Sequence, residues 1–350
     1  MVTLNDVARA AGVSPTAVSR HLNRSIALPK VTADRIDAAV ARLGYRPNAL
    51  AKRLSKGKAE AIGLAAPDIS NPFFAELVSV IEAAAAERGY GISLFSTRGD
   101  REREIEAVNH LADRYFDGLI LIAAQPDDGT LGALISRQNH IVLLDEDVLG
   151  AQAPRVFVEN AAGTRMATEH LIAMGHRDIA VIAGPDGLGS VAERIEGFVG
   201  AMIAHSLPVD ERRLMHGSFT SDFGYQAALA VARMSPRPTA ILTCSDYLSV
   251  GVLRALHHLG LSVPDDISLV GFDDMPLAEL FDPPLTTIRQ PIAEMGRLAL
   301  EWLLASIDGA EVPALTRLPV ELIVRKSVAD ITGGTVKAKP PALIKEGQPI

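Results

Sequence analysis

The chain has 350 residues, of which 34 are basic and 42 acidic, so its formal net charge is −8 at pH 7. This length accommodates two or three domains of roughly 100–200 residues and excludes a peptide hormone or a disulfide miniprotein. With 48% hydrophobic and 22% charged residues, the composition is that of an ordinary water-soluble globular protein rather than a disordered or fibrous one.

The first residues and the cysteine count indicate the compartment. The sequence begins MVTLNDVARAAGV, without the basic and then apolar stretch of a signal peptide, and no apolar run approaches the ~20 residues of a membrane span. Cys244 is the only cysteine, which excludes an intrachain disulfide and a cysteine-based zinc site. We therefore expect a cytoplasmic protein that is neither secreted nor inserted in a membrane.

Charge is distributed unevenly along the chain. Residues 1–60 contain eleven basic and four acidic side chains, a balance of +7, so the other 290 residues carry −15. Lys and Arg that neutralise phosphates release condensed counterions. A basic head on an acidic body therefore favours a polyanion that is bound at one end of the chain only.

The head begins with two short predicted helices. Thr3 and Asp6 form a capping-box pattern at the start of the first helix, which Gly12 ends. Ser14 is an N-cap for the second helix, with Pro15 at its first position, where the missing N–H costs nothing. Two helices joined by a tight glycine turn are typical of a helix-turn-helix unit, which places its second helix in the DNA major groove.

The second helix presents polar side chains outward. Thr16, Ser19, Arg20 and Asn23 are spaced to face solvent, and Arg20 is long enough to reach guanine O6 and N7. Ser19 or Thr16 can reach bases or phosphates. A third helix, capped by Thr32, completes a three-helix bundle. The alternative is a purely structural bundle, but the polar face and the +7 charge favour DNA binding.

A basic segment, NALAKRLSKGK, follows Pro47. Leu50 and Leu54 lie four residues apart in it, among four basic side chains. The segment is too short and too basic to be a stable isolated helix. We expect it to fold only against a partner chain and DNA, where a leucine wedges between base steps in the minor groove.

Two stretches together resemble a known family. Thr3–Asn23 (TLNDVARAAGVSPTAVSRHLN) and Gly44–Lys58 (GYRPNALAKRLSKGK) are similar to the headpiece and hinge helix of the lactose-repressor (LacI/GalR) family of bacterial transcription regulators, and the resemblance continues to about residue 330. It implies a homodimer or tetramer that binds a palindromic operator, with bases read at Pro15, Thr16 and Arg20 and with Leu54 intercalating. Pro15 departs from the family pattern because it has no side-chain donor. The expected DNA-binding residues are Thr3, Pro15, Thr16, Ser19, Arg20, Asn23, Asn48 and Leu54.

From residue 61 onward, short apolar strands alternate with amphipathic helices. The expected strands are 62–65, 92–95, 119–122, 141–144, 179–183, 240–242 and 268–271. The expected helices are 72–88, 101–114, 161–174, 194–204, 222–232 and 247–259. This alternation predicts parallel sheets covered by helices. The fold class is therefore an N-terminal all-α helix-turn-helix headpiece plus an α/β core of two doubly wound parallel-sheet subdomains, which resembles the periplasmic sugar-binding proteins of transport systems.

The expected domains are a headpiece at 1–47, a hinge helix at 48–58 and a core at 59–330. Within the core, lobe 1 takes about 60–160 and 290–320, and lobe 2 takes about 161–289 and 321–330, with a strand around 315–324 returning to lobe 2. The tail 331–350 is rich in Gly, Pro and Lys and is expected to be disordered. Three crossings between the lobes make a hinge, and the cleft beyond the carboxyl ends of the strands is the expected ligand site.

Residues at those strand ends form the candidate effector site. They are Phe73, Phe74, Asp145, Ser190, Arg194, Phe219, Asp246 and Asp273. The resemblance implies that Ser190 and Arg194 touch the effector, and Arg194 opens the family's R-x-x-G-F motif. A guanidinium and carboxylates facing an aromatic wall suit sugar hydroxyls, since each ionised group makes two hydrogen bonds to vicinal OH groups. Core packing of the rings and turn capping by Asp145 are the alternatives.

We therefore expect a dimeric DNA-binding repressor under allosteric control by a monosaccharide or a sugar-derived metabolite. A purine or other nucleobase is the alternative effector, because Phe73 and Phe219 would also stack on a flat base. A sugar carrier is opposed by the DNA-type head. An enzyme is not expected: the glycines of residues 184–189 do not follow G-x-G-x-x-G, and the sequence has no Walker motif, nucleophile elbow or HExxH. No cofactor and no metal are expected.

Overall fold

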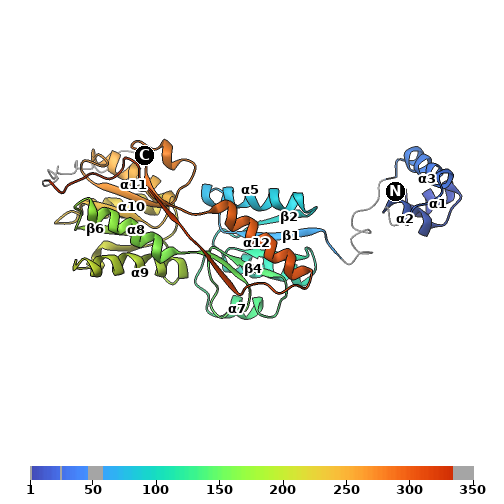
Figure 1. Ribbon diagram of the computed structural model, residues 1–350, viewed down its shortest axis with the longest axis horizontal. Coiled ribbons are helices and arrows are strands. Elements are labelled where there is room, and N and C mark those ends of the chain that lie inside the picture. The colour runs from blue at the N-terminus through green and yellow to red at the C-terminus, as the bar shows by residue number, and fades with distance from the viewer. Residues whose placement is uncertain (1, 24–25, 46–57, 334–350) are drawn as a thin grey trace. The chain divides into compact units, whose positions relative to one another are not determined.

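The computed structural model of the protein describes residues 2–23, 26–45 and 58–333, which belong to two compact units divided after Ala59 (Figure 1). The predictions for Asn48 and Leu54, and for most of the hinge segment and the tail, lie outside the described residues. No described helix combines the length and the hydrophobicity that crossing a bilayer requires.

The head unit contains α1 (Leu4–Ala11), α2 (Pro15–Leu22) and α3 (Lys30–Leu43). The Thr3 N–H donates to Asp6 Oδ2 at 3.0 Å while the Asp6 N–H donates to Thr3 Oγ1 at 3.3 Å, which confirms the capping box. Gly12 ends α1 with φ +62°, a left-handed conformation that glycine adopts without steric cost. Ser14 Oγ accepts from the Ala17 N–H at 3.2 Å and caps α2, as predicted.

The third helix begins earlier than predicted. Thr32 is not its cap: α3 starts at Lys30, and the carbonyl of Pro29 accepts the Thr32 N–H at 2.8 Å. Pro29 is the N-cap residue, and its carbonyl accepts the first backbone hydrogen bonds of the helix. The helix therefore starts here without a side-chain cap. The head core, which joins all three helices, consists of Val7, Ala8, Ala11, Val18, Ile36 and Ala39.

Lobe 1 of the body is built on a six-stranded parallel sheet in the order β11-β5-β4-β3-β1-β2. Its strands are β1 (Ala61–Ala66), β2 (Gly91–Ser96), β3 (Gly118–Leu121), β4 (Ile141–Leu144), β5 (Arg155–Val158) and β11 (Leu315–Leu318). Its helices are α5 (Pro72–Glu87), α6 (Arg101–Ala112), α7 (Thr130–Ile135) and α12 (Ile292–Ile307). Ile120 and Ile122 pack in a hydrophobic core with residues of α5 and α12 on one face of the sheet. Leu119 and Leu121 point to the other face and are also fully buried, so both faces of the sheet are covered.

Lobe 2 repeats the plan with the order β12-β10-β9-β8-β6-β7, in which β12 runs antiparallel to β10. Its strands are β6 (Ile179–Ala183), β7 (Leu214–His216), β8 (Ala240–Thr243), β9 (Ser268–Asp273), β10 (Thr286–Arg289) and β12 (Glu321–Ile323). Its helices are α8 (Asn160–Ala173), α9 (Gly189–Ala204), α10 (Ser221–Ala232) and α11 (Asp246–His258). Ile182 packs with α10 and α11, and its neighbour Val181 packs with α8 and α9, so the helix pairs lie on opposite faces (Figure 1).

Within residues 58–333 the chain crosses between the lobes three times, after β5, after β10 and after β11. The strand expected around 315–324 is not continuous. Pro319 interrupts it, so that β11 joins the sheet of lobe 1 and β12 joins the sheet of lobe 2. Because proline has no N–H to donate to a ladder, it ends one strand and lets the chain pass to the other sheet.

Candidate functional site

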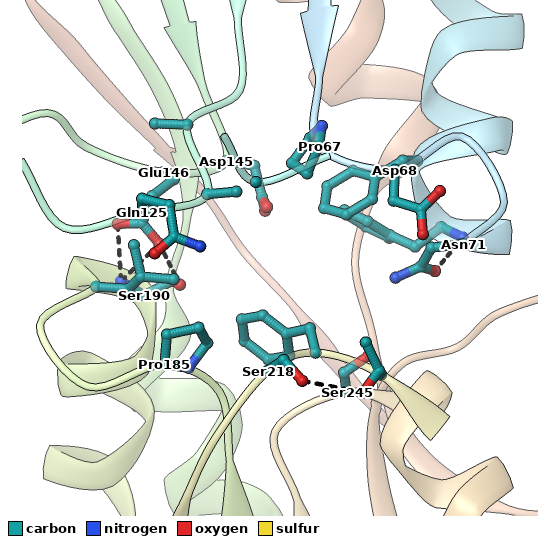
Figure 2. Close-up of a pocket in the computed structure, with 18 of the residues that line it drawn as sticks. Pro67, Asp68, Asn71, Gln125, Asp145, Glu146, Pro185, Ser190, Ser218 and Ser245 are labelled. Atoms are coloured by element: carbon teal, nitrogen blue, oxygen red, sulfur yellow. Dashed lines mark hydrogen bonds between the residues drawn. The ribbon is translucent and has the colours of Figure 1, made fainter. Parts of the chain in front are cut away.

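A cavity of about 510 Å³ lies between the two lobes of the body. Its walls are the loops that follow β1, β2, β3 and β4 in lobe 1 and β6, β7 and β8 in lobe 2, together with the ends of β9 and β10 (Figure 2). Seven of the eight predicted effector residues line it: Phe73, Phe74, Asp145, Ser190, Arg194, Phe219 and Asp273. The structure thus brings these seven together, and their contact with an effector stays a prediction.

Asp246 does not line the pocket. It is the first residue of α11, and its carboxylate accepts from the Met275 N–H at 2.9 Å and from the Thr287 hydroxyl at 2.7 Å. Gly271 leaves room for it, because a Cβ there would lie 2.0 Å from Asp246 Oδ1. The N-cap residue Ser245, one position earlier, takes the place at the pocket instead.

Arg194 is held by three groups of lobe 2. Its Nε donates to Asn160 Oδ1 at 2.9 Å, its Nη1 donates to the carbonyl of Cys244 at 2.5 Å, and its guanidinium carbon lies 3.8 Å above the centre of the Phe272 ring. The side chain is 3% exposed. A guanidinium fixed in this way presents its charge to the pocket at one position, without a further cost in side-chain entropy when a ligand binds.

Two buried carboxylates share the pocket with Arg194. Asp273 accepts from the Ser245 hydroxyl at 2.9 Å and from Gln290 Nε2 at 2.8 Å, and burial raises its pKa to about 6 although Arg194 opposes the shift. Burial also raises the pKa of Asp145, again against the charge of Arg194. Both acids have a positive φ, +67° at Asp145 and +125° at Asp273, a strained conformation for residues other than glycine that is concentrated at functional sites.

Asn71, Glu146, Ser245 and Gln290 are among the polar pocket residues that were not predicted from the sequence. Glu146 directly follows Asp145 in LLDED, so its position after a strand was a usable signal. Gln290 directly follows the strand β10, and only the pairing of β10 with β9 brings it beside Asp273. Asp145 Oδ1 and Gln290 Oε1 are buried and have no hydrogen-bond partner among the described residues.

The aromatic residues differ in how much of the ring faces the pocket. Phe73 is 3% exposed and belongs to the core of lobe 1, where its ring meets that of Phe74 edge to face at 5.2 Å. Phe74 and Phe219 are only partly buried. The Phe219 ring lies against Gly184, where a Cβ would be 2.2 Å from its Cζ. Phe74 and Phe219 therefore form the more accessible part of the aromatic wall.

In the head unit, five of the predicted DNA-binding residues gather on α2 and its C-terminal cap. Pro15, Thr16, Arg20 and Asn23 are exposed, and Thr16 and Arg20 lie one turn apart on the same face. Ser19 is half-buried and accepts from Asn23 Nδ2 at 3.4 Å. Thr3 lies apart from them at the start of α1, where its hydroxyl accepts from the Asp6 N–H in the capping box.

Both units match known families. Residues 3–48 match the bacterial regulatory proteins of the lacI family, and residues 168–328 match the periplasmic binding protein-like domain. The HTH-type transcriptional repressor PurR of Vibrio campbellii is 34% identical over 331 residues, which are 94% of this chain and 99% of that protein. This chain belongs to the lacI family of bacterial regulatory proteins.

Solved structures of transcriptional regulators share the architecture of this chain. The Lac repressor dimer bound to operator and the anti-inducer ONPF is 30% identical, with a TM-score of 0.81, and the match covers 94% of this chain and 99% of that one. The complex of the transcriptional regulator CelR with cellobiose is 31% identical, with a TM-score of 0.70 over 93% of this chain and 100% of that one. The predicted fold class is confirmed, and the relatives are transcriptional regulators rather than enzymes.

Proposed function

We propose that this chain is a transcriptional repressor that binds a DNA operator as a dimer through its head and responds to a small hydroxylated molecule bound between the lobes of its body. Similarity over nearly the whole chain to the repressor PurR and to the operator-bound Lac repressor dimer supports the first part. The observation that carries the second part is that two buried acceptor atoms in the pocket have no hydrogen-bond partner in the part of the chain that the structure describes.

The face of α2 is the proposed base-reading surface. Thr16 and Arg20 lie one turn apart on it and are exposed, and Arg is the side chain that most often reads guanine through O6 and N7. Pro15 has no side-chain donor, so base reading falls on Thr16 and Arg20. Ser19, Asn23 and the backbone N–H groups of the first turn are then available for phosphates or neighbouring bases.

A monosaccharide or sugar derivative is the proposed effector. Asp145 Oδ1 and Gln290 Oε1 need donors, and Arg194 offers donors between two carboxylates. A hydroxyl group both donates and accepts, so vicinal hydroxyls can satisfy carboxylate, amide oxygen and guanidinium together. The cavity has the size of a small-molecule site, and similarity to the CelR–cellobiose complex points the same way.

A purine or other nucleobase is the second candidate, and it fits the aromatic wall at least as well. Phe74 and Phe219 present partly exposed rings, which stack on a flat base as readily as on a sugar face. Ring N–H groups would also serve the unpartnered acceptors. The relatedness to the repressor named PurR adds to this candidate.

A thermal-shift screen of the purified full-length protein separates the two candidates. The panel contains neutral monosaccharides, sugar acids, sugar phosphates and the nucleobases adenine, guanine and hypoxanthine. A ligand at about one hundred times its Kd adds about 2.7 kcal/mol to the free energy of unfolding, which raises the unfolding temperature by several degrees. Stabilisation by a neutral sugar supports the proposal, and stabilisation by nucleobases alone replaces it with the second candidate.

A further inference from the structure

Glu146 joins the two lobes at the wall of the pocket. It follows β4 in lobe 1, but its carboxylate binds the first turn of α9 in lobe 2 (Figure 2). Its Oε1 accepts from the Gly189 N–H at 2.8 Å, and its Oε2 accepts from the Ser190 hydroxyl at 2.5 Å. The Ser190 N–H approaches the same carboxylate at 3.2 Å. Glu146 is 3% exposed, so this contact is shielded from solvent.

The contact supplies what the sequence of α9 lacks. This helix has 16 residues, its N-cap is Leu188, which makes no side-chain capping bond, and its first turn contains no acid. The first N–H groups of a helix have no partner within the helix, and together with the helix dipole they form a binding site for phosphate or carboxylate. In α9 that position is already filled by a carboxylate from the opposite lobe.

Most charged groups around the N-terminus of α9 disfavour an anionic ligand or already have a partner, although Arg98 also lines the pocket. Asp145 lies directly before Glu146, and Asp147 after it is paired with Arg155 at 2.8 Å. Arg194 is bonded to Asn160 and to the Cys244 carbonyl. The loop before α9 is pressed against lobe 1, since a Cβ at Gly187 would lie 3.0 Å from Pro126 Cγ.

We propose that Glu146 is a specificity-determining residue, which fills the N-terminus of α9 from the opposite lobe and so restricts the closed pocket to effectors without a phosphate or carboxylate group. A phosphorylated or carboxylated molecule would have to displace Glu146 and place its charge beside Asp145. This inference rests on the proposed function, in that the interlobe pocket is taken as the effector site. It adds the class of molecule that the pocket rejects.

The test uses sulfate as the probe anion and needs no knowledge of the effector. Thermal unfolding of the full-length protein is compared at about pH 8, above the pKa of Glu146 of about 7, in about 10 mM sodium sulfate and in sodium chloride of equal ionic strength. We expect sulfate to raise the unfolding temperature of Glu146→Ala by several degrees more than that of the wild type. Glu146→Gln keeps an oxygen at α9 and should behave like the wild type.

Two further variants make the result specific. Adding Ser190→Ala to Glu146→Ala removes one donor of the vacated site and should reduce the sulfate effect. Glu146→Ser is the second vacating variant and should gain sulfate stabilisation if Glu146→Ala does not fold. The proposal is overturned if sulfate raises the unfolding temperature of the wild type and of Glu146→Ala equally, or if it does not raise that of a folded Glu146→Ala or Glu146→Ser variant. It is also overturned if neither Glu146→Ala nor Glu146→Ser folds, because Glu146 would then be a structural cap.

A neutral monosaccharide panel on the wild type is run beside the sulfate experiment. If no sugar stabilises the protein while sulfate stabilises Glu146→Ala, the proposed effector class is wrong and the assignment of Glu146 stands. If a sugar stabilises the wild type but sulfate has no effect on the folded Glu146→Ala variant, the proposed function stands and the assignment of Glu146 is overturned.

Discussion

Arg20 is the residue on which operator specificity should depend most. It is exposed on the same face of α2 as Thr16, and a bidentate contact with guanine contributes about 1–3 kcal/mol of discrimination between bases. We expect Arg20→Ala to weaken specific operator binding by about tenfold or more while non-specific DNA binding falls much less. Fluorescence anisotropy with operator and scrambled duplexes at matched salt measures both.

Arg42 on α3 provides the matched control for charge. It is another exposed arginine of the head, so Arg42→Ala removes the same charge away from α2. Both duplexes should lose affinity to a similar, small extent in this variant. An equal loss on both duplexes in Arg20→Ala would contradict base reading by that residue.

Glu146 should make stability depend on pH. Burial raises its pKa from 4.5 to about 7, so the folded protein holds this proton over a pH range in which the unfolded chain has lost it. The resulting stabilisation is present below a pH of about 4.5 and is lost as the pH rises through about 7. Glu146→Gln cannot titrate. We therefore expect the unfolding temperature of the wild type to fall more steeply between pH 5 and pH 7.5 than that of Glu146→Gln.

Two other carboxyl groups titrate in the same pH range, and the comparison between wild type and Glu146→Gln controls for them. The pKa of Glu104 is raised to about 7 by burial, and the pKa of Asp273 to about 6. Both remain in Glu146→Gln, so the difference between the two pH profiles isolates Glu146. Parallel profiles would show that the Glu146 proton is not linked to folding.

The stability of the helix α2 depends on its N-cap residue Ser14. Ser14 Oγ satisfies the Ala17 N–H, and loss of such a cap costs about 1 kcal/mol of helix stability. Ser14→Ala should therefore lower operator affinity by up to about tenfold, by populating heads whose α2 is frayed. Ser14→Thr keeps a hydroxyl cap and should bind like the wild type. Equal operator affinities of the Ala and Thr variants, measured by anisotropy, would exclude this role.

Local signals predicted most elements, and long-range contacts set the rest. The capping box at Thr3 and the turn at Gly12 depend on residues within one helical turn, so the sequence was sufficient to place α1 and α2. The start of α9 was predicted five residues too late, because its first turn is completed by Glu146 from the other lobe. The expected strand 315–324 is divided at Pro319 into β11 and β12. The division could not be predicted from local sequence, because β11 pairs in the sheet of lobe 1 and β12 pairs in the sheet of lobe 2.

In the candidate site, too, residues identified by local sequence were predicted, and residues placed by long-range contacts were missed. Strand ends were sufficient to find Asp145 and Asp273, because the carboxyl ends of parallel strands converge on one edge. The same reasoning failed at Asp246, which begins a helix and bonds to Met275 and Thr287 behind the pocket wall. Gln290 was missed because only the pairing of β10 with β9 places it beside Asp273.

In the proposed repressor, ligand binding between the lobes changes the affinity of the head for the operator. The helix α9 is suited to carry this coupling within the body, because it holds the pocket residue Arg194 and contacts lobe 1 through Glu146 and through the Glu193–Arg317 pair at 2.5 Å. A coupling free energy between two sites is typically about 1–3 kcal/mol, which is roughly a 5- to 150-fold change in affinity. The sign of the change decides between induction and corepression.

Arg194→Lys should weaken ligand binding in the pocket and so reduce the effect of the ligand on operator affinity. A lysine cannot reproduce both the Asn160 and the Cys244 bonds of the guanidinium, and each hydrogen bond to a charged group contributes about 1.5–3 kcal/mol. We expect ligand affinity to fall by at least about tenfold. The control is Arg254→Lys, which alters a partly exposed arginine of α11 that stacks on Tyr225 and does not line the pocket.

An operator titration with and without the ligand found in the thermal-shift screen decides whether the pocket controls operator binding. It is run at one salt concentration for the wild type, Arg194→Lys and Arg254→Lys. We expect the ligand to change the operator Kd by roughly 5- to 150-fold in the wild type and Arg254→Lys, and to change it little or not at all in Arg194→Lys at the same ligand concentration. An operator Kd that the ligand leaves unchanged in the wild type, or changes equally in Arg194→Lys, would contradict control of operator binding by the pocket.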